Sequence, residues 1–258
     1  MFGICNLSII PCRAEPSDKS EMVTQLLFGE SFQIIKEQNQ WRFIRSAFDN
    51  YEGWIDKKQF LSVSEETYNE LQAAPIYYST DLINVITQKE TNAAMPIVIG
   101  SSLPLFENEI CNLEGNEYSF QGQTVNSSAT IDREKLIENA YTYLNAPYLW
   151  GGRSPFGIDC SGLTQMVYKL AGIVLPRDAY QQAEIGQTLS FLEEAQIGDL
   201  AFFDNTDGHI IHTGIILKNN LIIHASGKVR IDRFDHQGIY NAENRIYSHN
   251  LRLIKKII

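Results

Sequence analysis

The chain has 258 residues, enough for two or three small domains rather than one. With 44% hydrophobic and 20% charged residues, its composition is that of an ordinary soluble globular protein. Its 21 basic and 31 acidic residues give a formal net charge of −10, which argues against nucleic acid and anionic membrane surfaces as partners because both attract cationic proteins.

The N-terminal segment MFGICNLSIIPC is apolar but has neither the basic residues nor the cleavage site of a secretory signal. No apolar run is long enough to span a bilayer. If Met1 is the natural start, we expect a cytoplasmic protein; the alternative is an exported protein whose leader has been removed. Cys5 and Cys12 could pair in an oxidising compartment, but we favour two reduced, small apolar residues.

Residues 1–62 contain short runs of apolar and β-branched residues separated by turns. The runs are Val23–Phe28, Ser31–Lys36 and Trp41–Ser46, with a turn-forming stretch at 49–53. This pattern predicts a small all-β barrel.

Residues 63–130 begin with a polar, helix-permissive stretch that Pro75 closes. Short β-like runs follow, among them Met95–Ile99 and Glu117–Phe120. We interpret 63–130 as a linker and a second small β unit.

From residue 131 the pattern changes to helices followed by strands. Asp132 is a suitable N-cap for a helix whose apolar face is Leu136, Ile137, Ala140, Tyr141 and Leu144. A second helix follows Cys160 and stops at Gly172, and a shorter one runs from Asp178 to near Gly186. Strands are then predicted at Asp199–Asp204, Ile211–Leu217 and Leu221–Ala225. Helices before an antiparallel sheet predict an α+β domain over 131–258.

Cys160 is the first candidate for chemistry because a glycine-rich loop leads into the helix that it begins. The free N–H groups and positive partial charge of a helix N-terminus stabilise a thiolate, which predicts a lowered thiol pKa, and they can also bind an oxyanion. The alternative is an inert buried cysteine.

A nucleophilic thiol needs a base, and His212 and His224 are the candidates. Side chains alternate faces along a strand, and a three-residue loop at 218–220 sets Leu217 opposite Leu221. His212 and His224 then lie on one face as diagonal neighbours, so that His224 can hold the second nitrogen of His212. Two alternatives are ordinary core histidines and a zinc site that includes Cys160. Zinc is disfavoured because no fourth ligand and no closely spaced ligand pair is evident, so we expect no metal and no cofactor.

Six ordered motifs make 131–258 resemble the NlpC-type cell-wall peptidases, a branch of the papain-like fold. They are Tyr148-Leu149-Trp150-Gly151-Gly152, Asp159-Cys160-Ser161-Gly162, Leu175-Pro176-Arg177-Asp178, Gly198-Asp199-Leu200, His212-Thr213-Gly214-Ile215 and His224-Ala225-Ser226. One departure is Ala179, where some relatives have Ser.

The resemblance implies a role for each matching residue. It makes Cys160 the nucleophile, His212 the base and His224 the orienting residue. It places Tyr148 beside the oxyanion and has the substrate cleft lined by Asp159, Ser161 and Trp150.

The N-terminal units resemble bacterial SH3-like domains, and two of them before the catalytic domain resemble the γ-D-glutamyl-L-diamino acid endopeptidases. That subfamily cleaves murein stem peptides with a free N-terminal L-Ala, and its first SH3-like domain closes the cleft. The segments Arg13–Ser17 and Tyr51–Trp54 match the region that recognises the substrate amine, which implicates Glu15 and Tyr51.

The fold predicted as a whole is therefore α+β, a papain-like domain preceded by two small all-β barrels, in a protein expected to be a monomer. The predicted function is hydrolysis of the bond between D-Glu and the diamino acid in L-Ala-γ-D-Glu-diamino acid peptides. Two rival functions are a papain-like acyltransferase and a non-catalytic wall-binding protein. The first is disfavoured because no long apolar patch for a lipid acceptor is present, and the second because Cys160, His212 and His224 all remain.

Overall fold

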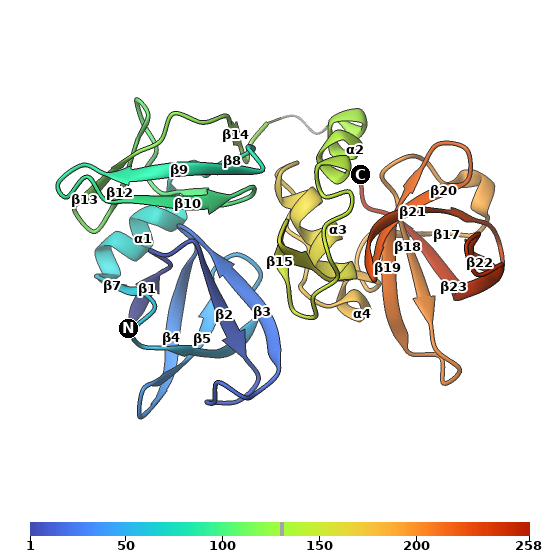
Figure 1. The fold of residues 1–258 in the computed structure, drawn as a ribbon, viewed down its shortest axis with the longest axis horizontal. Helices are drawn as coiled ribbons and strands as arrows, with labels where there is room; N and C mark the ends of the chain where they lie inside the picture. The colour runs from blue at the N-terminus through green and yellow to red at the C-terminus, as the bar shows by residue number, and fades with distance from the viewer. Residues whose placement is uncertain (130–131) are drawn as a thin grey trace. The chain divides into compact units, whose positions relative to one another are not determined.

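The structure is a computed structural model that describes residues 1–129 and 132–258 (Figure 1). The chain divides into two compact units, Met1–Ala129 and Thr130–Ile258. The domain boundary predicted between residues 130 and 131 lies outside the described residues.

The first half of the first unit is a β-barrel built from one seven-stranded sheet with the order β3-β2-β6-β5-β4-β1-β7. Its strands are β1 (Phe2–Ile4), β2 (Ile9–Arg13), β3 (Met22–Leu27), β4 (Ser31–Gln38), β5 (Trp41–Ser46), β6 (Glu52–Asp56) and β7 (Leu61–Val63). The three strand-like runs of the sequence are therefore confirmed as β3, β4 and β5. Cys5 and Cys12 are free thiols in the barrel core, as the favoured interpretation expected.

The second half of this unit contains one helix and two further sheets, ordered β10-β9-β13-β12 and β11-β8-β14. The elements are α1 (Glu65–Ala73), β8 (Tyr77–Ser79), β9 (Ile83–Gln88), β10 (Ala94–Val98), β11 (Ser102–Leu103), β12 (Ile110–Leu113), β13 (Asn116–Ser119) and β14 (Thr124–Asn126). One apolar core joins the two halves, because Ile4 and Phe28 of the first pack with Ile86 and Ile97 of the second. The predicted boundary at 62/63 thus falls inside a single compact unit, and the SH3-like character of the second half stays a prediction.

The second unit has helices first and an antiparallel sheet after them, as predicted. Its elements are α2 (Arg133–Thr142), β15 (Arg153–Ser154), β16 (Gly157–Ile158), α3 (Cys160–Lys169), α4 (Ala179–Gln182), β17 (Gln187–Leu189), the 3-10 turn η1 (Leu192–Glu194), β18 (Leu200–Asp204), β19 (Ile210–Leu217), β20 (Leu221–Ser226), β21 (Lys228–Phe234), β22 (Gly238–Asn241) and β23 (Ile246–Lys256).

The sheet order in this unit is β17-β23-β18-β19-β20-β21-β22, and an additional pairing between β22 and β23 closes it. Helix α3 packs on β19 and β20 beside α2 (Figure 1). The predicted helix from Asp178 to near Gly186 is shorter than expected, since α4 ends at Gln182.

Close backbone packing fixes the start of α3. Asp159 is its N-cap, with a side-chain oxygen 2.7 Å from the backbone nitrogen of Gly162. A side chain at Gly152 or Gly162 would place its Cβ 2.3 Å from a backbone oxygen, so both positions need glycine. Gly172, at φ +76°, ends the helical segment in the left-handed region.

Strands β19 and β20 pair in the predicted register. Leu217 lies opposite Leu221 and Gly214 opposite His224. His212, two residues before Gly214, is therefore the diagonal neighbour of His224 on the same face.

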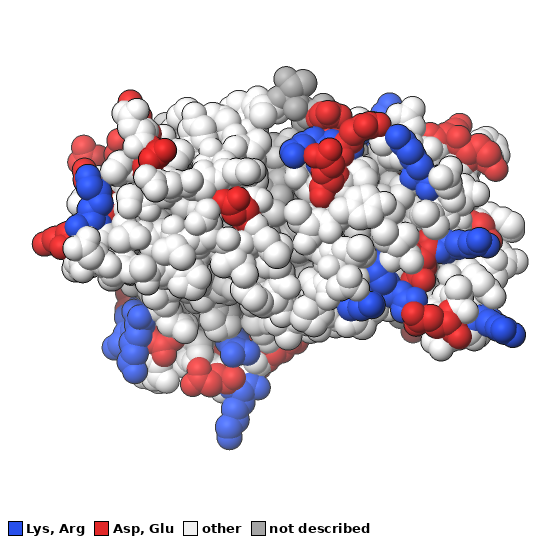
Figure 2. Space-filling view, turned by 45° about the horizontal axis from the view of Figure 1, so that its top comes forward, with Lys and Arg blue, Asp and Glu red and all other residues white. Residues whose placement is uncertain are grey.

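The surface carries both signs of charge, and acidic and basic side chains are interspersed on the face drawn in Figure 2. Among the described residues, no helix is both long and apolar enough to cross a bilayer.

Candidate active site

Cys160 is the first residue of α3 and only 7% of it is exposed. Backbone hydrogen bonds from Thr213 and Ser161 reach its sulfur. Because Thr213 follows His212 directly in β19, the helix N-terminus and the strand of the base meet at the thiol. The start of α3 therefore lies beside the strand that carries His212, and the pairing of His212 with Cys160 as base and nucleophile stays a prediction.

The thiol pKa is raised to about 12, chiefly by burial and then by the charge of Asp159. The N–H groups of Thr213 and Ser161 and the charge of Arg177 lower it, but by less. The sequence-based prediction of a lowered thiol pKa is therefore wrong. The helix N-terminus does stabilise a thiolate, but desolvation of the sulfur outweighs it.

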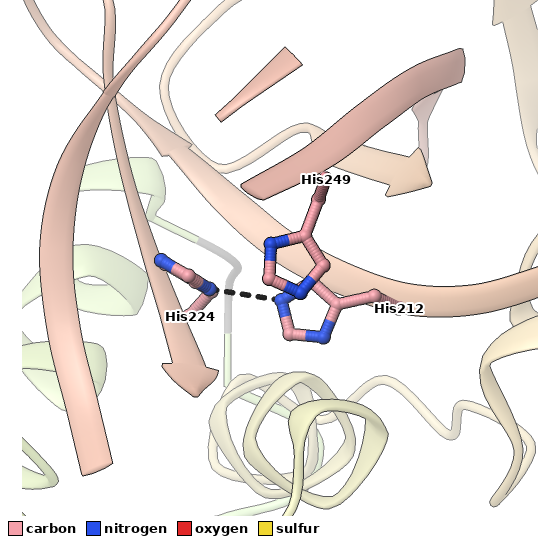
Figure 3. A group of neighbouring side chains, drawn as sticks. All are labelled: His212, His224 and His249. Carbon is pink, nitrogen blue, oxygen red and sulfur yellow. Dashed lines mark hydrogen bonds between the residues drawn. The ribbon is translucent and has the colours of Figure 1, made fainter. Parts of the chain in front are cut away.

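The predicted base, His212, is hydrogen-bonded to His224. His212 Nε2 lies 2.8 Å from His224 Nδ1 (Figure 3). Burial, followed by the neighbouring His224 and His249, lowers the pKa of His212 well below its usual value. With a raised thiol pKa and a lowered imidazole pKa, the resting site holds a neutral thiol beside a neutral imidazole.

The hydrogen-bonded series continues beyond the predicted pair. His224 Nε2 lies 3.0 Å from Asp232 Oδ2, and Arg230 donates to both carboxylate oxygens at 2.6 and 3.0 Å. Asp232 and Arg230 were not singled out from the sequence. In the structure β21 pairs with β20 so that Ile222 lies opposite Asp232, which makes Asp232 another diagonal neighbour of His224, but no strand was predicted there from the sequence.

A third histidine was also missed. The ring of His249, on β23, stacks on that of His212 with centroids 4.1 Å apart and planes 22° from parallel (Figure 3). Its Nδ1 lies 2.9 Å from Ser248 Oγ. Burial and the neighbouring His224 lower the pKa of His249 to about 4.

The three histidines raise the question of a metal, because their ligand nitrogens all lie within 4.8 Å of one another. Zn²⁺ binds an imidazole nitrogen at about 2.0–2.1 Å, close to the plane of the ring. The rings of His212 and His249 are stacked and nearly parallel, so they cannot both direct a lone pair at one ion without rotating. The arrangement instead fits a hydrogen bond between His212 and His224, with the ring of His249 stacked on His212.

Tyr148 lies in the loop before β15, half-buried, and its backbone N–H donates to the Gly227 carbonyl at 3.0 Å. Burial, then the nearby Cys160 and Asp159, raises the pKa of its phenol to about 12. The hydroxyl therefore remains protonated and can donate a hydrogen bond near the sulfur.

Asp159 has many partners inside the protein. Its carboxylate accepts from both terminal nitrogens of Arg177, at 3.0 and 2.6 Å, and from the backbone of Gly151 and Gly162. Ser161 Oγ also accepts from Arg177, at 2.9 Å. These bonds hold the helix start in place, and contact of Asp159 and Ser161 with a substrate stays a prediction.

The other predicted substrate residues lie at the surface. Trp150 is 60% exposed beside the glycine loop. In the first unit, Glu15 is exposed and Tyr51 is half-buried. Strands β2 and β6 pair antiparallel with Arg13 opposite Trp54, so the segments that carry Glu15 and Tyr51 leave the barrel at the same end.

Comparisons with known proteins show which family the chain resembles. Residues 145–248 match the NlpC/P60 family, and residues 12–60 match the bacterial dipeptidyl-peptidase Sh3 domain. The chain is 29% identical to dipeptidyl-peptidase 6 of Lysinibacillus sphaericus, over 87% of this chain and 88% of that protein. It is 30% identical to the gamma-D-glutamyl-L-lysine dipeptidyl-peptidase of Bacillus subtilis, over 78% of this chain and 71% of that one.

A crystal structure of an NlpC/P60 family protein from Bacillus cereus shares the fold. Its TM-score is 0.84 with 20% identity, and the match covers 100% of this chain and 99% of that one.

A thiol at a helix N-terminus, next to the strand of an imidazole that a second imidazole orients, defines a cysteine hydrolase. The chain belongs to the NlpC/P60 family of cysteine peptidases and carries a bacterial SH3 domain before its catalytic unit.

Proposed function

We propose that this peptidase cleaves the bond between γ-D-Glu and the diamino acid in murein peptides that begin with a free L-Ala. The observation that carries the proposal is the similarity, over most of both chains, to proteins named as dipeptidyl-peptidases, one of them for gamma-D-glutamyl-L-lysine. A dipeptidyl-peptidase releases two residues from a free N-terminus, which is the pattern of cleavage proposed here.

The reaction begins with attack of the Cys160 sulfur on the γ-carbonyl carbon of D-Glu. His212 removes the thiol proton as the S–C bond forms, because neither group is charged beforehand. The same proton then passes to the departing amine of the diamino acid as the C–N bond breaks. Water, activated by His212, hydrolyses the thioester and releases the dipeptide.

Charge that develops on the carbonyl oxygen needs hydrogen-bond donors. The N–H groups at the start of α3 have no partner within the helix, and the N–H of Ser161 is close enough to bond the sulfur. Tyr148 supplies a hydroxyl whose raised pKa keeps its proton at neutral pH. We infer that these donors stabilise the oxyanion.

Recognition of the free α-amine needs acceptors or negative charge. In the catalytic unit, the Asp159 carboxylate is already paired with Arg177. Glu15 and Tyr51 leave the first barrel at the same end, and the exposed Glu15 carboxylate makes no ion pair within 4 Å in the described structure. We therefore propose that Glu15 supplies the counter-charge, with Tyr51 as a further acceptor.

The test compares L-Ala-γ-D-Glu-L-Lys with its N-acetylated form. The wild type should release L-Ala-γ-D-Glu from the free peptide and act poorly on the acetylated one. Cys160→Ala should release nothing while it stays folded. Glu15→Gln should lose most of the preference for the free amine, whereas Asp18→Asn, in the same exposed loop, should keep it. Equal cleavage of both peptides by the wild type would overturn the amine proposal, and no cleavage of either would overturn the bond proposed.

A further inference from the structure

The hydrogen bonds that join His224, Asp232 and Arg230 indicate which ring nitrogens of the two site histidines carry protons. Asp232 is 7% exposed and His224 is 1% exposed, so each needs a defined partner. The only described side chains bonded to the Asp232 carboxylate are His224 and Arg230.

Asp232 is held in its ionised form. Burial alone would raise its pKa, but the hydrogen bonds from His224 and Arg230 outweigh burial and lower it. An ionised carboxylate only accepts hydrogen bonds and a guanidinium only donates them. The proton in the bond between His224 and Asp232 therefore lies on His224 Nε2.

The position of the proton on His224 in turn determines which nitrogen of His212 is protonated. A neutral imidazole carries one N–H, so in the neutral form of His224 with its proton on Nε2, Nδ1 is an acceptor. The atom 2.8 Å from it, His212 Nε2, must then be the donor. His212 Nδ1, on the other side of that ring, is left with a free lone pair to receive the thiol proton.

We propose that Asp232, held by Arg230, is a positioning residue that sets the tautomers of both histidines and so makes His212 a base towards Cys160. With the opposite arrangement, His224 would donate from Nδ1, His212 would carry its proton on Nδ1, and the thiol would face an N–H instead of a lone pair. Asp232 thus influences the sulfur of Cys160 indirectly, through the two intervening side chains of His224 and His212. The inference rests on the cysteine-peptidase mechanism and not on which peptide is cleaved.

The first experiment needs no substrate and no variant. Nitrogen-15 NMR of the imidazoles in the wild-type protein should show His212 with a protonated Nε2 and an unprotonated Nδ1, and His224 with the same pattern. A His212 protonated on Nδ1 would overturn the proposal outright. Because no turnover is measured, this outcome is independent of the proposed bond specificity.

The second experiment uses Asp232→Asn, which keeps the size of the side chain but no longer requires a proton on His224 Nε2. We expect kcat to fall by roughly 10²-fold or more with KM little changed, and the tautomers of His212 to become mixed. Glu243→Gln is the matched control, because it also removes a carboxylate bonded to Arg230, at 3.3 Å, but on the solvent side, where 73% of the Glu243 side chain is exposed. Its activity should equal that of the wild type.

A double-mutant cycle separates positioning from general damage. His224→Asn puts an amide oxygen near the position of Nδ1 and gives up the contact with Asp232. In that background Asp232→Asn should have little further effect on kcat, because its route to His212 is gone. Full additivity of the two losses, or a fall in activity for Glu243→Gln as large as for Asp232→Asn, would show that Asp232 matters only for stability.

Discussion

His249 lies flat against His212, with 4.1 Å between the ring centroids, so the proposed general base is covered on one face by a second imidazole. The two rings come from β19 and β23, which are not paired with each other but both pair with β18. Strand β18 thus lies between the two strands that carry the stacked rings of His212 and His249. Protonation of either ring would set a positive charge in a buried stack, and both pKa values are lowered as a result.

Acid stability should depend on this stack. Between pH 6.5 and about 4 the unfolded chain binds protons at His212 and His249 that the folded protein does not, so stability is present above pH 6.5 and falls as the pH drops through this range. His249→Phe keeps a ring over His212 and removes one titrating group. The denaturant-unfolding free energy of this variant should fall less steeply between pH 6.5 and 4 than that of the wild type.

The control for this experiment is His209→Phe, which changes an exposed histidine of the same unit. The free energy of unfolding of this variant should change with pH as steeply as that of the wild type, because the buried stack of His212 and His249 is unchanged. A His249→Phe slope equal to that of the wild type would mean that other groups cause the acid sensitivity.

Alkylation of Cys160 should report its protonation state. Because the thiol pKa is raised to about 12, the iodoacetamide rate should rise with pH between about 6 and 9, close to tenfold per unit if it follows the thiolate fraction. Labelling of Cys160→Ala, with its three remaining buried cysteines, gives the background. A rate that is already flat in this range would reveal a preformed thiolate–imidazolium pair and contradict the neutral resting site.

The buried ion pair at the start of α3 should be important for stability. Arg177 and Asp159 have side-chain exposures of 1% and 9%, so Arg177→Met leaves a carboxylate without its guanidinium in a dry environment. We expect a loss of about 3–5 kcal/mol in the free energy of unfolding. Lys135→Met breaks an ion pair whose side chains are 65% and 66% exposed and should cost about 0–1 kcal/mol.

A double variant completes this test. Asp159→Asn combined with Arg177→Met should be less destabilising than the sum of the two single changes, since neither charge is then left unpaired. Simple additivity would show that the pair contributes no coupling and that the N-cap alone holds the helix start.

Local sequence patterns were sufficient for much of the fold. The strands β3, β4 and β5, the N-cap at Asp132 and the helix after Cys160 all follow from periodicity and capping, which act over a few residues. The single core shared by the two halves of the first unit was not predicted, because Phe28 and Ile97 meet only through tertiary packing. Closure of the second sheet by β22 and β23 likewise depends on segments that have no local signature of their pairing.

The sequence by itself determined that Cys160 begins a helix and that His212 and His224 share one face of a hairpin, because helix starts and the two-residue period of strands are local rules. Only the tertiary structure decided what surrounds them. Asp232 and His249 reach the two histidines through strand pairings and stacking, and the thiol pKa rises instead of falling. The physical reason is that the desolvation of the thiol depends on every neighbouring atom, wherever that atom lies in the chain. A local sequence pattern does not specify those neighbours.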